Sequence, residues 1–205
     1  MHRNLMVIVA LVLAVVLVLP GKVRAAADDP FAKDTVIISA EGGFNHFGPR
    51  LETDGYLQTW NFGARLSLLP FAPFRPALLG HVLDGSIETG LEPVYVRFAS
   101  QNQNYGGLGL DLRYHLIGLS FGPFVPWINW MGGVGGTDVQ VDMLTGSFMF
   151  IMQAGAGVEY FVSGKNAVYL GYQYSHFSNG GTTYFNNTLN SPGGAVLGVS
   201  FFLPH

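Results

Sequence analysis

Hydrophobic and polar residues alternate at every second position along much of the chain beyond residue 28. In the clearest segment, 108–116, leucines and a tyrosine take the even positions, whereas Asp111, Arg113 and His115 take odd positions. Only a β-strand separates such sets onto two faces, because its side chains have a period of two. Each segment of this kind therefore has one apolar face and one small or polar face. The same alternation recurs at 58–68, 168–175 and 195–202.

The composition indicates where the apolar face points. Charged residues make up only 11% of the chain and hydrophobic residues 49%, whereas about 25% charge is usual for a water-exposed domain. A soluble sandwich or a lipocalin-like barrel would expose a face rich in Lys and Glu, but the second face here carries mainly Gly, Ser, Asn and Gln. An outer-membrane barrel reverses the arrangement, with apolar side chains in lipid and polar ones inside. The pattern favours the membrane barrel.

We predict an all-β fold, an eight-stranded antiparallel transmembrane β-barrel of the outer membrane. Short turns such as 163–166 would join the strands at one end and longer loops such as 182–192 at the other. A barrel of this size is filled by its own side chains, so no pore is expected. Segments rich in Gly and Pro at 70–85 and 131–146 are expected to interrupt the strands. The expected strands are 35–46, 55–69, 86–99, 106–117, 119–131, 147–162, 166–178 and 194–203.

The first 27 residues have the layout of a secretory signal peptide. Arg3 precedes an unbroken apolar stretch from Leu5 to Leu19, and small residues follow at 25–27. A transmembrane anchor is the alternative, but this stretch falls short of the roughly 20 apolar residues that cross a bilayer. We therefore divide the chain into a signal peptide, 1–27, and a barrel domain, 28–205, exported to the outer membrane of a Gram-negative bacterium.

Cysteine content and charge exclude several classes of function. The chain has no cysteine, which excludes a disulfide framework, a zinc–thiolate site and a cysteine nucleophile. Removal of residues 1–27 would take away Arg3, Lys22 and Arg24 and no acid, which moves the formal charge from −3 to −6. No basic run remains that could neutralise phosphates along a duplex. We expect no nucleic-acid partner, no metal and no cofactor.

His176 and Ser178 form a candidate base and nucleophile. Both continue the face of Leu170, Tyr172 and Tyr174, which we assign to lipid. Neighbours on one face lie roughly 6.6 Å apart along a strand, so side-chain rotamers can bring the imidazole to the hydroxyl. Alternatively, His176 is an interfacial histidine and Ser178 the start of a loop. An ionisable side chain on a lipid-facing surface is costly and tends to be functional, which favours the catalytic interpretation.

The segment that starts at His176 resembles a known signature. Its His-x-Ser-Asn-x-Gly pattern, followed by Asn186, Asn190 and Ser191, is similar to the His-x-Ser-Asn-x-Gly…Asn-x-Gly-x-(Glu/Asp/Asn) motif of the outer-membrane lipid A 3-O-deacylases, the PagL-like family. The resemblance is concentrated in residues 168–201. It implies an eight-stranded outer-membrane barrel that removes the 3-linked hydroxyacyl chain from lipid A and so modifies lipopolysaccharide.

The resemblance also implies roles for individual residues. Ser178 would be the nucleophile and His176 the general base, oriented by Asn190, which stands where family members often carry a glutamate. A neutral Asn190 can hold the imidazole tautomer but stabilises the imidazolium less than a carboxylate does. Thr188 stands where the family usually has Gly. The residues expected to shape the oxyanion site are Asn179, Gly181 and Asn186.

We therefore expect a metal-independent serine esterase, embedded in the membrane as a monomer or a homodimer, whose substrate is lipid A or lipopolysaccharide. One alternative is a non-catalytic small barrel with a structural or adhesion role, and another is a family member that has lost its activity. The loop after Ser178 is rich in amides and carries no charge. This loop favours the enzyme over an adhesion protein, which would need long charged loops.

Three further groups of residues have structural interpretations. Asp138 and Asp142 could bind calcium, but a solvated loop is the simpler interpretation because no third ligand is adjacent. Trp60, Trp127 and Trp130 are interpreted as anchors at the membrane interface. Charged residues on the polar faces are expected to form an ion-pair network inside the barrel. These residues are Glu41, Arg65, Arg97, Asp111, Arg113 and Glu159.

Overall fold

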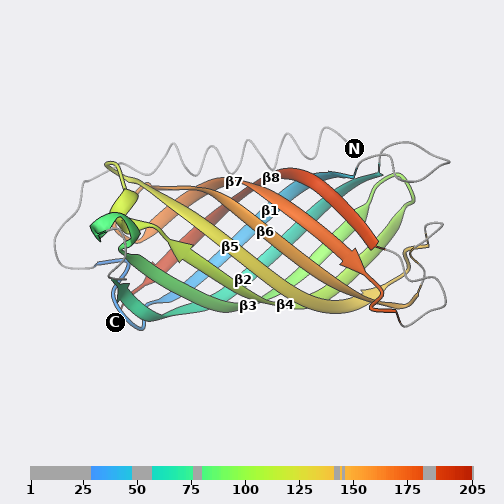
Figure 1. Ribbon diagram of the computed structural model, residues 1–205, viewed down its shortest axis with the longest axis horizontal. Helices are drawn as coiled ribbons and strands as arrows, with labels where there is room; N and C mark the ends of the chain where they lie inside the picture. Colours follow the sequence, from blue (N-terminus) through green and yellow to red (C-terminus); the bar gives the residue numbers. More distant parts are fainter. Residues whose placement is uncertain are drawn as a thin grey trace.

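The computed structural model describes residues 29–47, 57–75, 80–140, 144, 146–181 and 188–204, so the predicted signal peptide lies outside it. Eight antiparallel strands form a closed barrel, in which each strand pairs with the next and β8 returns to β1 (Figure 1). Two short 3-10 helices, η1 (Gly80–Leu83) and η2 (Ile117–Leu119), contact each other at one end. Among these residues, no helix has the length and apolar character needed to cross a membrane. The strands are β1 (Val36–Phe47), β2 (Leu57–Phe74), β3 (Gly85–Phe98), β4 (Gln103–His115), β5 (Phe124–Thr137), β6 (Phe148–Phe161), β7 (Asn166–Ser178) and β8 (Thr188–Leu203).

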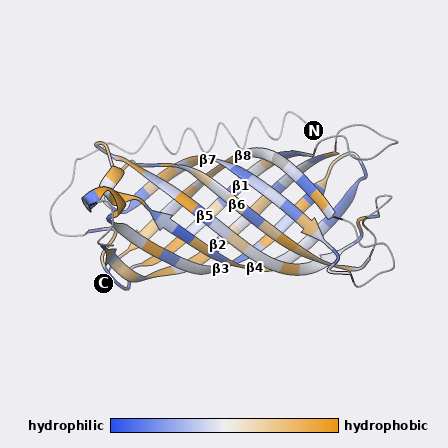
Figure 2. Ribbon diagram, viewed as in Figure 1, coloured by the Kyte–Doolittle hydropathy of each residue, from blue (hydrophilic) through white to orange (hydrophobic). Residues whose placement is uncertain are grey.

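The outer wall of the barrel is apolar, as the alternation predicts. Leu108, Leu110 and Leu112 of β4 are between 42% and 52% exposed. Asp111 and Arg113, at the alternate positions of the same strand, are buried. Figure 2 shows hydrophobic and hydrophilic residues alternating along the strands. This arrangement is typical of a barrel whose outer wall faces lipid. The predicted fold class is confirmed.

Side chains fill the barrel in layers. At the end where β7 stops, Phe177 packs edge-on against Phe98 and Tyr105, with ring centroids 5.4 and 5.5 Å apart. At the other end, Phe31 and Phe202 belong to a second apolar cluster. The charged side chains that are buried inside the barrel lie between these two apolar clusters. Each cluster therefore separates the buried charges from one end of the barrel.

The central layer is an ion-pair network. Arg65 reaches Glu88 at 2.9 Å and Glu92 at 3.2 Å. Arg113 reaches Glu159 at 3.4 Å, and His115 lies between Glu88 and Glu159, at 2.8 and 3.0 Å. The predicted network is therefore present, with Glu88, Glu92 and His115 as additional members.

Two residues were assigned to the wrong face of the barrel. Arg97 belongs to the outward-facing set of β3 and bonds to Asn102 and Asn104 at the rim, not inside the barrel. Trp127 is buried rather than at the membrane interface, and its ring lies 4.4 Å from the guanidinium carbon of Arg113. An indole inside the barrel supplies a face for that cation, which alternation alone does not indicate.

The two predicted interruptions are wrong in part, because strands run into both segments. β2 continues to Phe74 and β5 to Thr137. In β5 the glycines permit close backbone approach: a Cβ at Gly135 would lie 2.3 Å from the carbonyl oxygen of Gly106. In β2 the pairing with β3 shifts register after Leu68, and such irregularities accommodate prolines within a strand.

β8 begins at Thr188 rather than at 194, so Asn190 lies in a strand and not in a loop. A register shift between Gln173 and Ser175 of β7 marks a bulge in β8. An extra residue reverses the side-chain alternation. Exposed residues of β8 are odd-numbered from 195 to 203 but even-numbered at 188 and 190. The bulge thus turns Thr188 and Asn190 to the outer wall.

Gly193 provides the backbone conformation of this bulge. Its φ is +147°, a region that L side chains rarely adopt, and a Cβ there would lie 1.8 Å from the ring of Tyr172. The Gly193 N–H donates to Ser191 Oγ at 3.1 Å, and the Ser191 hydroxyl donates to the His46 carbonyl at 3.0 Å. These bonds tie the bulge to β1.

Candidate active site

β7 and β8 bring three of the predicted residues together on the outer wall, at the end of the barrel opposite η1 and η2 (Figure 1). His176 pairs with Asn190, and Ser178, the last residue of β7, pairs with Thr188. From β6, Met152 is the register partner of His176. The side chains of His176 and Ser178 are half-buried, and Asn190 is exposed.

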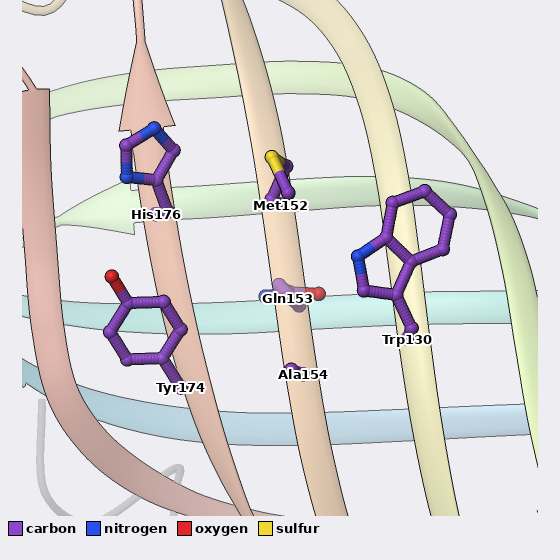
Figure 3. Close-up of a pocket in the computed structure, with 6 residues that line it drawn as sticks. All are labelled: Trp130, Met152, Gln153, Ala154, Tyr174 and His176. Atoms are coloured by element: carbon purple, nitrogen blue, oxygen red, sulfur yellow. The ribbon is translucent and has the colours of Figure 1, made fainter.

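The imidazole of His176 is held by Asn190. Its Nδ1 lies 2.7 Å from Asn190 Oδ1. An amide oxygen only accepts hydrogen bonds, so this contact requires the ring proton on Nδ1 and leaves Nε2 as the basic nitrogen. In Figure 3, Nδ1 faces β8 and Nε2 points along β7 towards its C-terminal end, where Ser178 follows two residues later.

Two hydroxyl groups hold the Asn190 amide. The Tyr174 hydroxyl donates to Asn190 Oδ1 at 2.5 Å, and Asn190 Nδ2 donates to Thr188 Oγ1 at 3.4 Å. Sequence reasoning missed Tyr174 as part of the site. Tyr174 stands two residues before His176 on the same face of the strand, and this position was the signal that could have assigned it to the site.

The turn after β7 supplies two consecutive backbone donors. Gly180 and Gly181 have φ values of +63° and +73°. The Gly180 N–H donates to Ser178 Oγ at 3.0 Å, and the Gly181 N–H donates to Asn179 Oδ1 at 3.0 Å. Asn179 is buried. Asn186, the remaining predicted oxyanion residue, lies outside the described residues.

A shallow hollow of about 220 Å³ opens beside His176 on the outer wall (Figure 3). Trp130 of β5, Ala154 of β6 and Tyr174 of β7 lie at one level of the wall, because Ala154 is the register partner of both aromatic residues. The small Ala154 between two rings creates the hollow, which Met152 and Gln153 also line. Sequence alone could not find Trp130 or Ala154, since strand register sets their distance from His176.

The calcium interpretation of the 138–142 loop gains no support. Asp138 accepts hydrogen bonds from the backbone N–H and the side-chain Nδ2 of Asn104. The bond from that N–H lowers the pKa of Asp138. Asp138 thus connects the segment after β5 to the start of β4, and Asp142 lies outside the described residues. Within the described part of the chain, no three His, Cys, Asp or Glu residues are placed to hold a metal ion.

A sequence profile of the family described as Lipid A 3-O-deacylase (PagL) matches residues 40–196. The chain belongs to the lipid A 3-O-deacylase (PagL) family. The match includes β7 with His176 and Ser178, the turn after it, and Asn190 of β8. Membership in this deacylase family favours the enzyme hypothesis over a non-catalytic structural or adhesion barrel. A comparison with curated protein sequences finds no match.

Solved structures similar to this lipid A 3-O-deacylase family member include outer-membrane barrels. The crystal structure of the outer membrane enzyme PagL has a TM-score of 0.54 and 15% identity, covering 81% of this chain and 98% of that one. Neisserial surface protein A (NspA) has a TM-score of 0.54 and 12% identity, covering 82% and 96%. The N-terminal β-barrel domain of Pseudomonas aeruginosa OprF has a TM-score of 0.51 and 15% identity, covering 83% and 98%. At these identities the likeness establishes the fold.

Proposed function

We propose that this family member is a serine esterase that hydrolyses the 3-linked hydroxyacyl ester of lipid A in the outer leaflet of the outer membrane. The contact between His176 Nδ1 and Asn190 Oδ1, beside Ser178 on the lipid-facing wall, is the observation that carries the proposal. A hydroxyl, an imidazole and an orienting oxygen form the arrangement of a catalytic triad. Export by the signal peptide 1–27 and assembly as a monomer or homodimer remain predictions.

The first half-reaction acylates Ser178. His176 Nε2 takes the proton of the Ser178 hydroxyl, and Oγ attacks the acyl carbonyl carbon. The bond from that carbon to the lipid A oxygen then breaks, and His176 returns the proton to the leaving alcohol. In the second half-reaction, water loses a proton to His176 and attacks the acyl-serine. The bond from the acyl carbon to Ser178 Oγ then breaks, His176 returns the proton to Oγ, and the hydroxy fatty acid is released.

The turn after β7 supplies donors for the oxyanion. The Gly180 N–H is already directed at Ser178 Oγ. When Oγ becomes an ester oxygen it accepts hydrogen bonds less well, so this N–H can donate to the adjacent oxyanion instead. We assign the Gly181 N–H, the buried amide of Asn179 and the amide of Asn186 to the same site. Preorganised donors of this kind stabilise the charge that develops on the carbonyl oxygen.

The hollow beside His176 is where we place the acyl chain. Trp130 and Tyr174 would form its walls, and Ala154 its floor. An acyl chain in the bilayer can reach this site by lateral motion along the outer wall, without leaving the lipid. A site inside the barrel would require the ester to leave the membrane, and packed side chains fill that space.

Removal of the nucleophile or the base tests the proposal. We expect Ser178→Ala and His176→Gln each to lower the deacylation rate by about 10³-fold or more. The measurement is mass spectrometry of lipid A incubated with detergent-purified protein, in which the wild type removes one hydroxyacyl group. A heat-modifiable band on gel electrophoresis establishes that each variant forms a barrel.

Ser175→Ala is the matched control. Ser175 lies on the same strand but is buried inside the barrel, where its hydroxyl accepts a hydrogen bond from Gln153. We expect this variant to keep its activity within a few-fold. Full deacylation by folded Ser178→Ala would show that Ser178 is not the nucleophile. Lipid A left intact by the folded wild type would indicate an inactive family member.

A further inference from the structure

We propose that Tyr174 is a positioning residue, which holds the Asn190 amide in the one orientation that leaves His176 Nε2 unprotonated. The inference rests on the proposed function and adds a residue to it. The Tyr174 hydroxyl and His176 Nδ1 both contact the same atom, Asn190 Oδ1, at 2.5 and 2.7 Å. Tyr174 lies on the outer wall, two residues before His176 on β7.

An amide at the orienting position creates a problem that a carboxylate does not have. Both carboxylate oxygens accept hydrogen bonds, so either can receive the proton on His176 Nδ1. Rotation of Asn190 by half a turn would instead present Nδ2, a donor, to the ring. The ring would then carry its proton on Nε2 and could not accept the Ser178 proton there. In a serine protease, replacing the orienting Asp by Asn costs about 10⁴-fold in kcat for this reason.

The contacts around Asn190 favour the productive orientation. With Oδ1 towards the ring, the Tyr174 hydroxyl and His176 Nδ1 both donate to Oδ1, and Nδ2 donates to Thr188 Oγ1. The Tyr174 hydroxyl, His176 Nδ1 and Asn190 Nδ2 then each donate to an acceptor. In the rotated orientation Nδ2 would face the Tyr174 oxygen, and the Tyr174 proton would lose its acceptor on a wall that faces lipid. Leaving a donor unpaired in such surroundings is costly.

The Tyr174 hydroxyl reaches Asn190 because the Tyr174 side chain leans from β7 towards the neighbouring strand β8. Tyr174 extends from β7 on the side of β8, as Figure 3 shows, and the Ala154 side of its ring borders the hollow. The ring therefore has two contacts to separate in any experiment: its apolar face beside the acyl chain and its hydroxyl on Asn190. Tyr174→Phe removes only the hydroxyl, so it tests the second contact.

A double-mutant cycle tests the proposal. We expect Tyr174→Phe to lower kcat by about tenfold or more with KM little changed, because without the hydroxyl the rotated orientation of Asn190, in which His176 cannot accept the Ser178 proton, becomes the predominant one. In an Asn190→Asp background, where both oxygens accept, we expect the same substitution to cost less than about twofold. Equal losses in the two backgrounds, or no loss in the first, would overturn the proposal.

The matched control is Tyr160→Phe. Tyr160 is 40% exposed on the outer wall near the opposite end of β6, where its ring lies 5.0 Å from that of Phe124. We expect this substitution to leave kcat unchanged in both backgrounds. A comparable loss at Tyr160 would mean that removing any phenol from the wall disturbs the barrel, and the proposal would fail.

A second measurement does not depend on catalysis or on the Asn190→Asp variant. Nitrogen-15 NMR of the imidazole groups in detergent micelles distinguishes a protonated ring nitrogen from a bare one, and the His176→Gln variant identifies the His176 signals. We expect the wild type to carry its proton on Nδ1 and Tyr174→Phe to carry it on Nε2 in roughly nine molecules of ten, as a tenfold loss in kcat requires. An unchanged tautomer in Tyr174→Phe would overturn the proposal. The wild type could leave lipid A intact while Tyr174→Phe still changed the tautomer of His176. In that case the proposed function would fail and the positioning role of Tyr174 would stand.

Discussion

At the scale of single residues, the size of Ala154 sets the shape of the outer wall beside His176. It faces lipid between Trp130 and Tyr174, and its small side chain leaves the hollow in which we place the acyl chain. Because this side chain points away from the barrel interior, a larger residue there fills the hollow without disturbing the core. Ala154 therefore offers a test of substrate binding that is separate from folding.

We expect Ala154→Phe to lower kcat/KM for lipid A by about tenfold or more, since displacement of the ester from the proposed catalytic pair is costly. The free energy of unfolding should change little. Ala64→Phe, at an exposed position of β2, is the matched control and should keep full kcat/KM. Steady-state kinetics with both variants would decide the matter, and equal kcat/KM for the two would place the acyl chain elsewhere.

At the scale of elements, one bulge in β8 determines which residues meet His176. Beyond the bulge the strand exposes Ala195 and Leu197, and before it the strand exposes Thr188 and Asn190. Without the extra residue, Asn190 would point into the barrel, away from the imidazole. The candidate site therefore depends on a backbone irregularity at Gly193 as much as on the side chains themselves.

We expect deletion of Gly193 to restore a uniform alternation in β8 and to turn Asn190 inwards. Deacylation should then fall by about 10²-fold or more, because His176 loses its orienting oxygen, while the protein still forms a heat-modifiable barrel. Deletion of Gly146, outside the strands in the loop between β5 and β6, is the control and should be tolerated. If the Gly193 deletion kept wild-type activity, the bulge would not be what positions Asn190.

At the scale of the whole molecule, charge is concentrated in the middle of the barrel. Arg65 is within 3.6 Å of Glu41, Glu88, Glu92 and Asp111. Arg113 lies over the rings of Trp127 and Tyr169, with 4.4 and 4.5 Å to the ring centroids. Acids outnumber arginines in this layer, so each arginine compensates several carboxylates that are buried or partly buried.

We expect Arg65→Met to lower the free energy of unfolding by about 3–5 kcal/mol, because it leaves buried carboxylates uncompensated. Urea unfolding in detergent, followed by gel mobility, measures this change. Arg97→Met removes an arginine that bonds to Asn102 and Asn104 at the rim, and should cost only about 0–1 kcal/mol. Equal effects of the two substitutions would contradict a central role for the buried network.

Most of the outward faces, the strand number and the outward position of the candidate pair, His176 and Ser178, could be predicted from the sequence. A period of two survives any tertiary arrangement, since it arises from the backbone of each strand, so Leu108 and His176 were placed on the lipid side without coordinates. The faces of Arg97 and Trp127 were predicted wrongly. Around both residues the alternation of apolar and polar positions is ambiguous. Only packing against the neighbouring strands decides whether each side chain points into the barrel or out of it.

By itself the sequence determined the periodicity, the apolar outer wall and the His-x-Ser motif, because these depend only on neighbours along the chain. The tertiary structure alone decided that β8 starts at Thr188, that its bulge turns Asn190 outwards, and that Tyr174 shares an oxygen with His176. It also brought Trp130 and Ala154 beside the imidazole. These contacts depend on the register between strands, which is set by the closure of the whole barrel and not by any one segment.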